Sequence, residues 1–338
     1  NKAGKYGAAV YLGQRCSLNI NNNTSVVFRG NESQSGGAMY DSFPESAYDM
    51  YLNDNTSLLF ENNVADGGYG GALYVGEGQM ANNTSVSFLN NSATYGGAVF
   101  NNGDVFKIEG NGKVDFIGNN AEYGGAMYYS LYNQGINILG NTGDVTFRDN
   151  HVRHYNTDGE LESIALNSVD FNVGYSHTNN LAANEGQSII FADAIADRLC
   201  DTTNVDKTLC TTVLNRYTPI GQSEAVVTQG VILFTGKDAA TRLAALWEKN
   251  GLKPQGELFD SALVESTTSN IGHTKLYGGT LAVEDGAALK VGYFYAKDGS
   301  TLRLKDSTVH FLFKQYYYHD YPCLLYTSPS PRDVEESR

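Results

Sequence analysis

Residues 85–100, Ser-Val-Ser-Phe-Leu-Asn-Asn-Ser-Ala-Thr-Tyr-Gly-Gly-Ala-Val-Phe, contain both short motifs that decide the fold of this chain. The first motif is Phe-x-x-Asn, and the second is Gly-Gly-Ala followed by an apolar and an aromatic residue. The first occurs at Phe28 and Asn31, Phe60 and Asn63, Phe88 and Asn91, Phe116 and Asn119, and Phe147 and Asn150. Intact copies of the second begin at Gly36-Gly37, Gly70-Gly71, Gly96-Gly97 and Gly124-Gly125, and a degenerate copy begins at Gly7. A period of about 30 residues indicates one supersecondary unit stacked on copies of itself.

The residues that lead into each Phe predict a strand. Two residues before each Phe stands Val or Leu, whereas the residue directly before it is of no consistent type. One fixed face and one variable face at a period of two are typical of a half-buried β-strand. We expect the motif Asn at a sharp corner, because Asn tolerates the left-handed backbone conformation. The double Gly allows positive φ or a close approach of two backbones, and the final aromatic can stack on its counterpart one repeat away.

Stacking such units on their own copies gives an all-β parallel β-helix, in which coils hydrogen-bond one another at about 4.8 Å. A β-propeller is the rival repeat fold, but its blades need roughly 40–50 residues each.

Composition excludes several classes of partner. The formal net charge is −14 and there is no basic stripe, which disfavours nucleic acid. No apolar run of 18 residues occurs, so no helical membrane span is expected. The chain opens inside a repeat, and we expect a fragment whose leader and first coils are missing.

Four regions follow from the distribution of residues. Residues 1–160 are predicted to be motif-dense coils, since 23 of the 33 asparagines lie in the first 150 residues. Residues 161–275 are predicted to be coils with loop and helical insertions, and 276–319 the final coils. Residues 320–338 hold three of the six prolines and no repeat, and we interpret them as a non-native or disordered tail.

In the second half, strands are expected at 168–173, 188–191 and 231–234, and short helical insertions at 193–200 and 238–249. Ala240, Leu243, Ala244 and Trp247 share one face of the second insertion. That helix either packs on the side of the solenoid, which we favour, or docks a partner. Turns at Asp285-Gly286 and Asp298-Gly299 between alternating strands indicate that the solenoid resumes.

Little in the sequence indicates chemistry. Cys200 and Cys210 flank a polar loop and could close a disulfide, but spacing alone does not decide whether they do. His151 and His154 form a weak metal pair without an evident third ligand, and we interpret them as solvated loop histidines. No nucleophile elbow or phosphate loop occurs. We therefore predict no catalytic residue, no metal site and no cofactor.

The tandem motifs resemble those of the chlamydial polymorphic outer-membrane proteins and kindred autotransporters. The stretches 279–291 and 299–302 are similar to later passenger coils of that group, and the resemblance covers about residues 1–315. It implies a right-handed, single-stranded β-helix, secreted and displayed at the bacterial cell surface. It also implies attachment to the outer membrane through a C-terminal β-barrel that this chain does not contain.

The resemblance favours a non-enzymatic adhesin-type passenger whose partner is a surface protein or a glycan. We expect binding at the side loops 41–54, 129–140 or 195–229. One alternative is a passive stalk. Another is a β-helix polysaccharide lyase or hydrolase, which would need two carboxyl groups roughly 5–10 Å apart across a groove.

Overall fold

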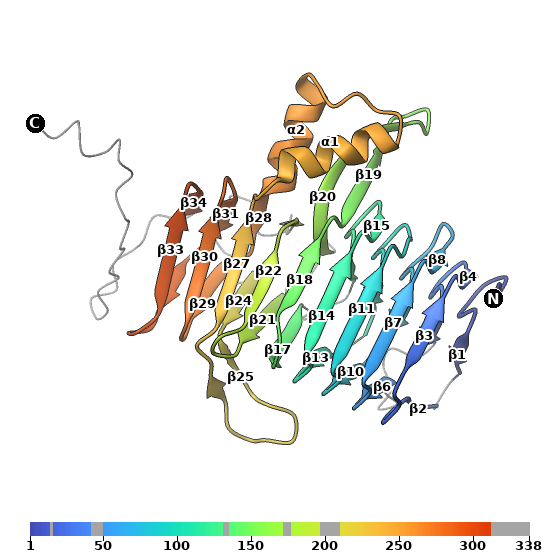
Figure 1. Ribbon diagram of the computed structural model, residues 1–338, viewed down its shortest axis with the longest axis horizontal. Coiled ribbons are helices and arrows are strands. Elements are labelled where there is room, and N and C mark those ends of the chain that lie inside the picture. Colours follow the sequence, from blue (N-terminus) through green and yellow to red (C-terminus); the bar gives the residue numbers. More distant parts are fainter. Residues whose placement is uncertain are drawn as a thin grey trace, which may run out of the picture.

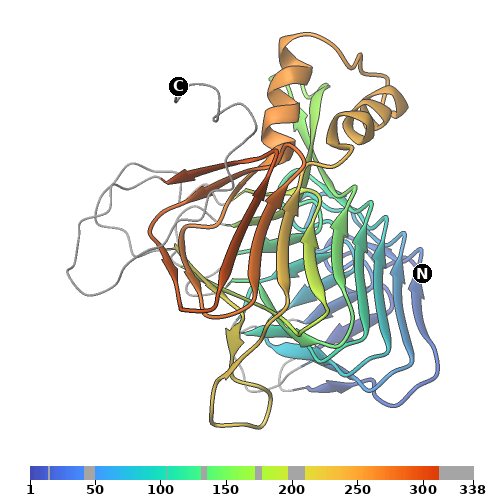
Figure 2. The ribbon, with the colours of Figure 1, turned by 60° about the vertical axis from the view of Figure 1, so that its left-hand side comes forward.

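A computed structural model describes residues 1–13, 16–41, 50–103, 105–130, 135–171, 177–196 and 210–311. Within them the chain winds into successive coils stacked along one axis, and most strands pair in parallel with the matching strand of the next coil (Figure 1). Figure 2, turned by 60°, shows the coils lying one behind another around a common interior. The chain is therefore the parallel β-helix that the repeats predict.

Three sheets run along the axis of the described residues. The tyrosine sheet contains β1 (Val10–Leu12), β5 (Met39–Asp41), β9 (Leu73–Val75), β12 (Val99–Asn101), β16 (Met127–Tyr129) and β20 (Leu161–Phe171), which joins it to β19 (His151–Tyr155), β15 (Asn120–Ala121) and β23 (Ala194–Ala196). The bridging sheet contains β2 (Leu18–Asn19), β6 (Met50–Asn53), β10 (Gly78–Ala81), β13 (Phe106–Glu109), β17 (Asn137–Asn141), β21 (His177–Ala183), β24 (Cys210–Leu214), β29 (His273–Leu276) and β32 (Phe294–Ala296). The phenylalanine sheet contains β3 (Val26–Arg29), β7 (Ser57–Glu61), β11 (Ser85–Leu89), β14 (Lys113–Ile117), β18 (Val145–Arg148), β22 (Ser188–Phe191), β27 (Val231–Thr235), β30 (Thr280–Glu284) and β33 (Thr301–Lys305).

Smaller elements complete the described fold. They are the pairs β4 (Glu32–Ser33) with β8 (Val64–Ala65) and β25 (Arg216–Tyr217) with β26 (Val226–Val227), the sheet of β28 (Thr268–Asn270), β31 (Ala288–Val291) and β34 (Thr308–Phe311), and the helices α1 (Ala239–Lys249) and α2 (Glu257–Thr267). The bridging and phenylalanine sheets run on past residue 160, so the change in composition there is not an interruption of the solenoid.

The motif phenylalanines form one continuous column inside the coils. The parallel register aligns Phe60 with Phe88 and Phe88 with Phe116, and their ring centroids lie 4.8 and 4.7 Å apart. Phe28 and Phe147 continue the stack at 5.2 and 4.6 Å. The column then extends through Phe191 and Phe234, at 4.9 and 5.1 Å, beyond the last motif. The predicted stacking of the motif on its own copies is confirmed.

The motif asparagines are buried and form a hydrogen-bonded ladder, which we call the motif ladder. Its members are Asn31, Asn63, Asn91, Asn119 and Asn150. The Nδ2 of each donates to the Oδ1 of the next at 2.8–2.9 Å. The same Oδ1 accepts the backbone N–H of the preceding ladder residue, as Asn91 does for Asn63 at 3.0 Å. The Nδ2 also donates to a backbone carbonyl of the coil before, as from Asn91 to Phe60 at 3.0 Å.

The expectation that these asparagines take the left-handed conformation is wrong. The residue before each of them does so instead, as with Asn62 at φ 52°, Asn90 at φ 54° and Asp149 at φ 59°. The motif position requires the side chain of Asn instead. Its Nδ2 donates and its Oδ1 accepts hydrogen bonds, so one residue can bond to the coil on either side.

A second ladder, which the sequence analysis missed, lies at the corner that precedes the phenylalanine sheet. Its members are Asn23, Asn55, Asn83, Asn111 and Asn141, linked from Nδ2 to Oδ1 at 2.9–3.1 Å. A signal was present, because Asn stands two residues before the start of the strand in the second to fourth copies (Asn55, Asn83 and Asn111).

The first glycine of the double glycine adopts positive φ, and the second allows two backbones to approach closely, as the sequence predicts. Gly70 adopts φ 64°, which favours glycine. At Gly71 a Cβ atom would lie 2.0 Å from the carbonyl oxygen of Gly97 on the next coil, so a side chain would force the two coils apart.

The insertion at 238–249 forms helix α1, as predicted, and it packs on the outside of the solenoid (Figure 2). Its buried residues are Ala239, Leu243 and Trp247. Leu243 and Trp247 are therefore placed as predicted, whereas Ala244 is half-buried and Ala240 is exposed. Trp247 Nε1 donates to the carbonyl of Ile164 at 2.8 Å. Helix α2, which was not predicted, joins the same small apolar cluster through Ala262.

The predicted helix at 193–200 is wrong in its described part. Residues 194–196 form β23, which pairs in parallel with β20, while 197–200 lie outside the described residues. Ala194 and Ile195 are both buried. Successive buried residues hide the alternation that identifies a strand, and pairing with β20 overrides the helical propensity of alanine.

Substitution of one of two adjacent asparagines in a coil should reduce stability, whereas substitution of the other should leave it unchanged. Asn91→Ala removes the partner of the Asn63 and Phe60 groups, and buried unpaired groups cost about 1–3 kcal/mol each, so we expect a loss of at least about 3 kcal/mol. Asn90→Gly should stay within about 0.5 kcal/mol, because glycine accepts positive φ. Urea unfolding of both variants measures these changes. Equal effects would show that the ladder is not needed for stability.

Candidate functional site

A two-row band of aromatic side chains follows the outer face of the tyrosine sheet, and we call it the tyrosine strip. The inner row consists of the aromatic residues that end the second motif, which alternate along each strand with inward residues such as Met39 and Leu73. The outer row consists of residues that directly precede the first glycine. The inner row is Tyr11, Tyr40, Tyr74, Phe100 and Tyr128, and the outer row is Tyr6, Tyr69, Tyr95 and Tyr123.

Rings of the inner row contact one another from coil to coil, two pairs stacked as predicted (Tyr11–Tyr40 and Phe100–Tyr128) and two pairs tilted (Tyr40–Tyr74 and Tyr74–Phe100). Parallel pairing places Tyr40 opposite Tyr74, and their ring centroids are 4.4 Å apart. The spacings from Tyr11 to Tyr40, from Tyr74 to Phe100 and from Phe100 to Tyr128 are 5.9, 5.0 and 5.7 Å. Tyr74 and Phe100 are almost fully covered and form the floor of the strip.

The rings of the outer row stack on one another and also contact rings of the inner row. Tyr69 stacks on Tyr95 at 5.2 Å, and Tyr95 stacks on Tyr123 at 4.9 Å. Tyr95 also meets the inner ring of Tyr128 edge-on at 5.1 Å. In the second coil Ser35 takes the place of the outer tyrosine and pairs with Tyr6. The interruption leaves Tyr69 with an outer-row neighbour on one side, and 41% of this residue is exposed.

Burial affects the hydroxyl groups of four tyrosines of the strip. It raises the pKa of Tyr40, Tyr74, Tyr95 and Tyr128 above the ordinary value of 10, and the neighbouring phenols add to the effect. Asn102 Nδ2 donates to the hydroxyl oxygen of Tyr74 at 2.7 Å. Each phenol in its neutral form both donates and accepts a hydrogen bond, so the strip is uncharged and polar at its ring tips.

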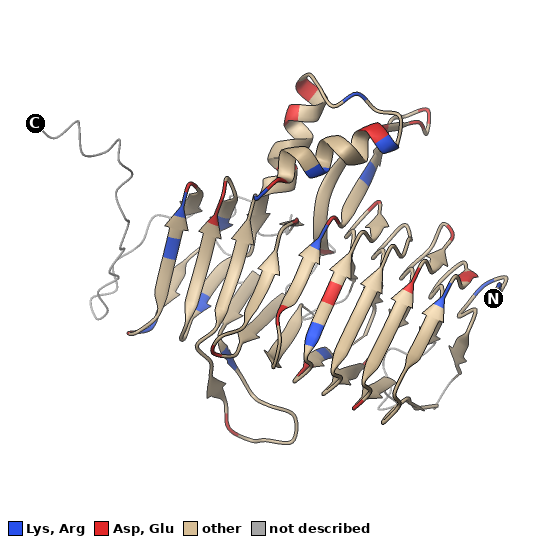
Figure 3. Ribbon diagram, in the orientation of Figure 1, with Lys and Arg blue, Asp and Glu red and all other residues tan. Residues whose placement is uncertain are grey.

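Charged residues of the described chain lie at the corners of the coils, on the two helices and on several strands, such as β14 and β33 (Figure 3). A carboxylate from Asp41, Glu122 or Asp170 lies close enough to Tyr40, Tyr95 or Tyr128, respectively, to raise the pKa of its phenol. The borders of the strip are therefore acidic.

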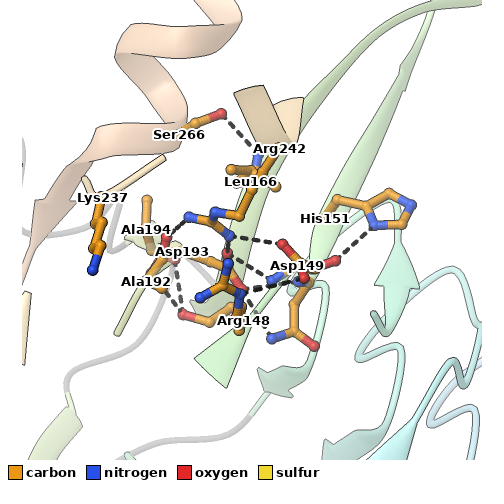
Figure 4. A network of polar contacts seen from close by, with 12 residues as sticks. Arg148, Asp149, His151, Leu166, Ala192, Asp193, Ala194, Lys237, Arg242 and Ser266 are labelled. Atoms are coloured by element: carbon orange, nitrogen blue, oxygen red, sulfur yellow. Dashed lines mark hydrogen bonds and ion pairs between the residues drawn. The ribbon is translucent and has the colours of Figure 1, made fainter. Parts of the chain in front are cut away.

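A network of polar contacts lies at the end of the motif ladder (Figure 4). Asp193 Oδ2 accepts from the backbone N–H and the Nδ2 of Asn150 at 2.8 and 3.0 Å. Its Oδ1 accepts from the Asp149 N–H at 3.0 Å and from Arg242 Nη1 at 2.8 Å. Arg242 Nη1 also lies 3.0 Å from Asp149 Oδ1.

This network ends the ladder and attaches helix α1. Asp193 occupies the place of the next asparagine, but a carboxylate has no donor and cannot continue the chain of bonds. Its side chain is fully buried, and burial raises its pKa, while Arg242 and Asn150 oppose that rise. Arg242, whose side chain is 8% exposed, supplies the compensating charge from α1. The arrangement is structural, because the Asp193 carboxylate is fully buried and both of its oxygens accept hydrogen bonds from the ladder and from Arg242.

The two histidines are not solvated loop residues, so that interpretation is corrected. Both lie in β19, which pairs antiparallel with β20. His151 is buried, its Nδ1 lies 3.2 Å from the Asp149 carbonyl, and burial lowers its pKa from 6.5 to about 4. His154 Nε2 lies 3.2 Å from Glu265 Oε2 of helix α2. The repeat is interrupted here because the chain forms this hairpin, which supports α1 and α2.

The predicted binding loops are largely not loops in their described parts. Residues 50–53, 137–141 and 210–214 are regular strands of the bridging sheet. In β17 the alternation is absent because every position is buried, whereas β6 and β24 do alternate between buried and half-buried residues and were overlooked. A described projection remains at 215–229, which includes the β25–β26 hairpin. There the Ile220 N–H donates to Glu109 Oε1 at 2.7 Å. Cys210 is disulfide-bonded, and Cys200 lies outside the described residues, so their pairing stays a prediction.

The outer row of the strip was not found from the sequence, although a signal existed. Tyr precedes the first glycine of the second motif in four of the five copies, at positions 6, 69, 95 and 123. Its position outside the defined motif concealed it.

No family model, curated protein or solved structure matches the chain. The described residues hold no cluster of three or more histidine, cysteine or carboxylate side chains that could bind a metal ion. Neither α1 nor α2 combines the length and apolar character needed to cross a bilayer. The case for a function therefore rests on the side chains themselves.

Removing the cation that attaches α1 should be costly. Arg242→Ala leaves Asp193 buried without its partner, and breaking such a pair costs about 3–5 kcal/mol. Adding Asp193→Asn should recover roughly half of the loss, because an amide can accept from Asn150 without a charge. Urea unfolding compares the two variants with the wild type. If the double variant is no more stable than Arg242→Ala, the ladder does not end as described.

His151 should make stability depend on pH. Its pKa is about 4 in the fold and 6.5 in the unfolded chain, so the unfolded chain gains the proton first. The contribution is complete above about pH 6.5 and is lost as the pH falls from 6.5 toward 4. Between pH 7 and 4.5, the wild type should lose about 2–3 kcal/mol more than His151→Gln. Equal losses in urea unfolding would contradict the depressed pKa.

Proposed function

We propose that this chain is the passenger fragment of an autotransporter, displayed at the bacterial surface, and that it acts as a non-enzymatic adhesin-type binding protein. One observation carries the proposal: the tyrosine strip repeats an aromatic side chain on successive coils, with Tyr6, Tyr11 and Tyr69 exposed and Tyr95 and Tyr123 half-buried. Tyrosine is enriched in binding surfaces because its ring supplies contact area and its hydroxyl supplies a hydrogen bond at low entropic cost.

The solenoid supports this role mechanically. Two ladders and the phenylalanine column hold each coil against the next, so the strip is presented on a stiff backbone. A preorganised surface loses little conformational entropy on binding, which favours affinity. Repetition along the axis adds avidity for a partner that contacts several coils at once.

Surface display is supported by the motif resemblance. A net charge of −14 also suits a protein that must remain soluble and avoid nonspecific contact with polyanions. The outer row of the strip is independent of the sequence resemblance, since its tyrosines lie outside the motifs that carry the resemblance, whereas the inner row belongs to the second motif.

The two alternatives differ in what they require. A hydrolase or lyase would need two accessible carboxyl groups. Burial raises the pKa of two carboxyl groups in the described residues, Asp193 and Glu109. Asp193 is buried beneath α1, and Glu109 lies on another sheet, under the 215–229 projection. A passive stalk would need no exposed aromatic strip.

Binding to cells distinguishes the adhesin from the stalk. A strip variant carrying Tyr69→Ala, Tyr95→Ala and Tyr123→Ala should bind a panel of cultured epithelial cells at least tenfold more weakly, because tyrosine contacts in interfaces are often worth 2 kcal/mol or more. A matched variant, Leu59→Ala with Ile117→Ala on the outer face of the phenylalanine sheet, should bind like the wild type.

Unchanged urea midpoints would establish that the strip variant is folded. If wild type and strip variant bind equally, or neither binds any cell type, the adhesin proposal fails and the stalk is favoured. Release of reducing ends from neutral or anionic polysaccharides by the wild type would instead support the enzyme.

A further inference from the structure

We propose that the tyrosine strip binds a linear, uncharged glycan chain that lies along the solenoid axis. This inference rests on the proposed binding function and names its ligand class. It is argued from the periodicity of the strip, its charge and the chemistry of its exposed atoms.

The periodicity favours a polymer with a short repeat. Phenol rings recur once per coil, at 5.2 Å from Tyr69 to Tyr95 and 4.9 Å from Tyr95 to Tyr123. One sugar residue of an extended glycan is about as long as this coil spacing of about 4.8 Å. Each sugar can therefore repeat the contact that its neighbour makes one coil away. The irregular surface of a globular protein does not repeat one contact at each coil in this way.

The electrostatics exclude an anionic glycan. The strip consists of phenol and phenyl rings, burial raises the pKa of Tyr40, Tyr74, Tyr95 and Tyr128, and Asp41, Glu122 and Asp170 lie close to three of these tyrosines. Of the basic residues, Lys2 and Lys5 stand near the strip in the first coil, and Lys2 is paired with Glu32 at 2.6 Å. A sulfated or carboxylated chain would thus meet a carboxylate close to Tyr40, Tyr95 and Tyr128, which disfavours its binding.

The exposed atoms match the surface of a sugar. Outer-row rings present their edges and hydroxyls, which suits the alternating C–H and O–H groups of a pyranose ring. At Tyr69 the row is interrupted by Ser35, so one side of this ring lacks an outer-row neighbour and can stack against the apolar face of a sugar. Tyr69 is therefore the residue on which binding should depend most strongly.

The length of the strip sets the number of sugars. It spans five coils, from Tyr6 and Tyr11 to Tyr123 and Tyr128, which is roughly 20 Å at about 4.8 Å per coil. Four or five sugar residues would cover it, and further residues would make no new contact there.

A glycan array and a length series test the proposal. The array carries linear β-1,3- and β-1,4-linked glucans, N-acetylglucosamine oligomers, α-1,4-linked glucans, and heparin and uronic-acid chains. We expect uncharged chains to bind and anionic chains not to bind. In calorimetric titrations of the binding series from dimer to hexamer, Kd should fall up to four or five sugars and then level off. It should not change between 50 and 500 mM salt.

Two substitutions at one position separate the ring from its hydroxyl. Tyr69→Ala should weaken binding of the pentamer at least tenfold, and Tyr69→Phe should weaken it two- to fivefold, while Leu59→Ala with Ile117→Ala should not change it. Absence of binding by every uncharged chain, preference for heparin, or an unaffected Tyr69→Ala variant would overturn the glycan proposal.

Cell binding and glycan binding, measured on the same variants, show which of the two proposals fails. If the strip variant loses cell binding but the wild type binds no uncharged glycan, the adhesin stands, its ligand is a protein, and the glycan inference is wrong. If the wild type binds uncharged glycans through Tyr69 but no cell type, the glycan inference stands and the adhesin proposal is wrong.

Discussion

Every coil of this solenoid turns sharply at corners that bury backbone and side-chain polar groups, and the fold depends on satisfying those groups from the adjacent coils. Asparagine does this at two corners. Asn91, for example, accepts from Asn63 and donates to both Asn119 and the Phe60 carbonyl. Since an unpaired buried amide costs about 1–3 kcal/mol, a coil shifted by one residue would lose several such bonds at once. The ladders therefore fix the register of the strands between them.

Register in turn accounts for the aromatic features. Because neighbouring coils are aligned residue for residue, a phenylalanine repeated in the sequence becomes a column in the interior, and a repeated tyrosine becomes a strip on the outside. The same alignment explains why the ladder must be terminated where the repeat ends. Asp193 accepts the last bonds from Asn150, and the charge that it introduces requires Arg242 from helix α1. The helical insertion is thus coupled to the ladder.

The repeat made the fold predictable, because a period of about 30 residues with one fixed strand face allows few architectures. Single residues were harder to place. The motif Asn was assigned a backbone role that its predecessor has, since partners on other coils cannot be seen along one strand. Residues 194–196 and 137–141 are buried on both faces, which removes the alternation that marks a strand. The outer tyrosines were overlooked because they differ from the defined motif by one position, and helix α2 because its apolar residues pack on β20 rather than on the coils.

The central claim is that adjacent coils pair residue for residue, and engineered cysteines test it directly in solution. Leu89 lies opposite Ile117 on adjacent coils. Leu89→Cys with Ile117→Cys should form a disulfide under mild oxidation, seen by peptide mass spectrometry, because paired residues of adjacent strands lie within the Cα separation that a disulfide spans. Ser87→Cys with Ile117→Cys, displaced by two residues, should not form one. Equal cross-linking of the two pairs, or cross-linking of the displaced pair alone, would contradict the stacked register on which the account is built.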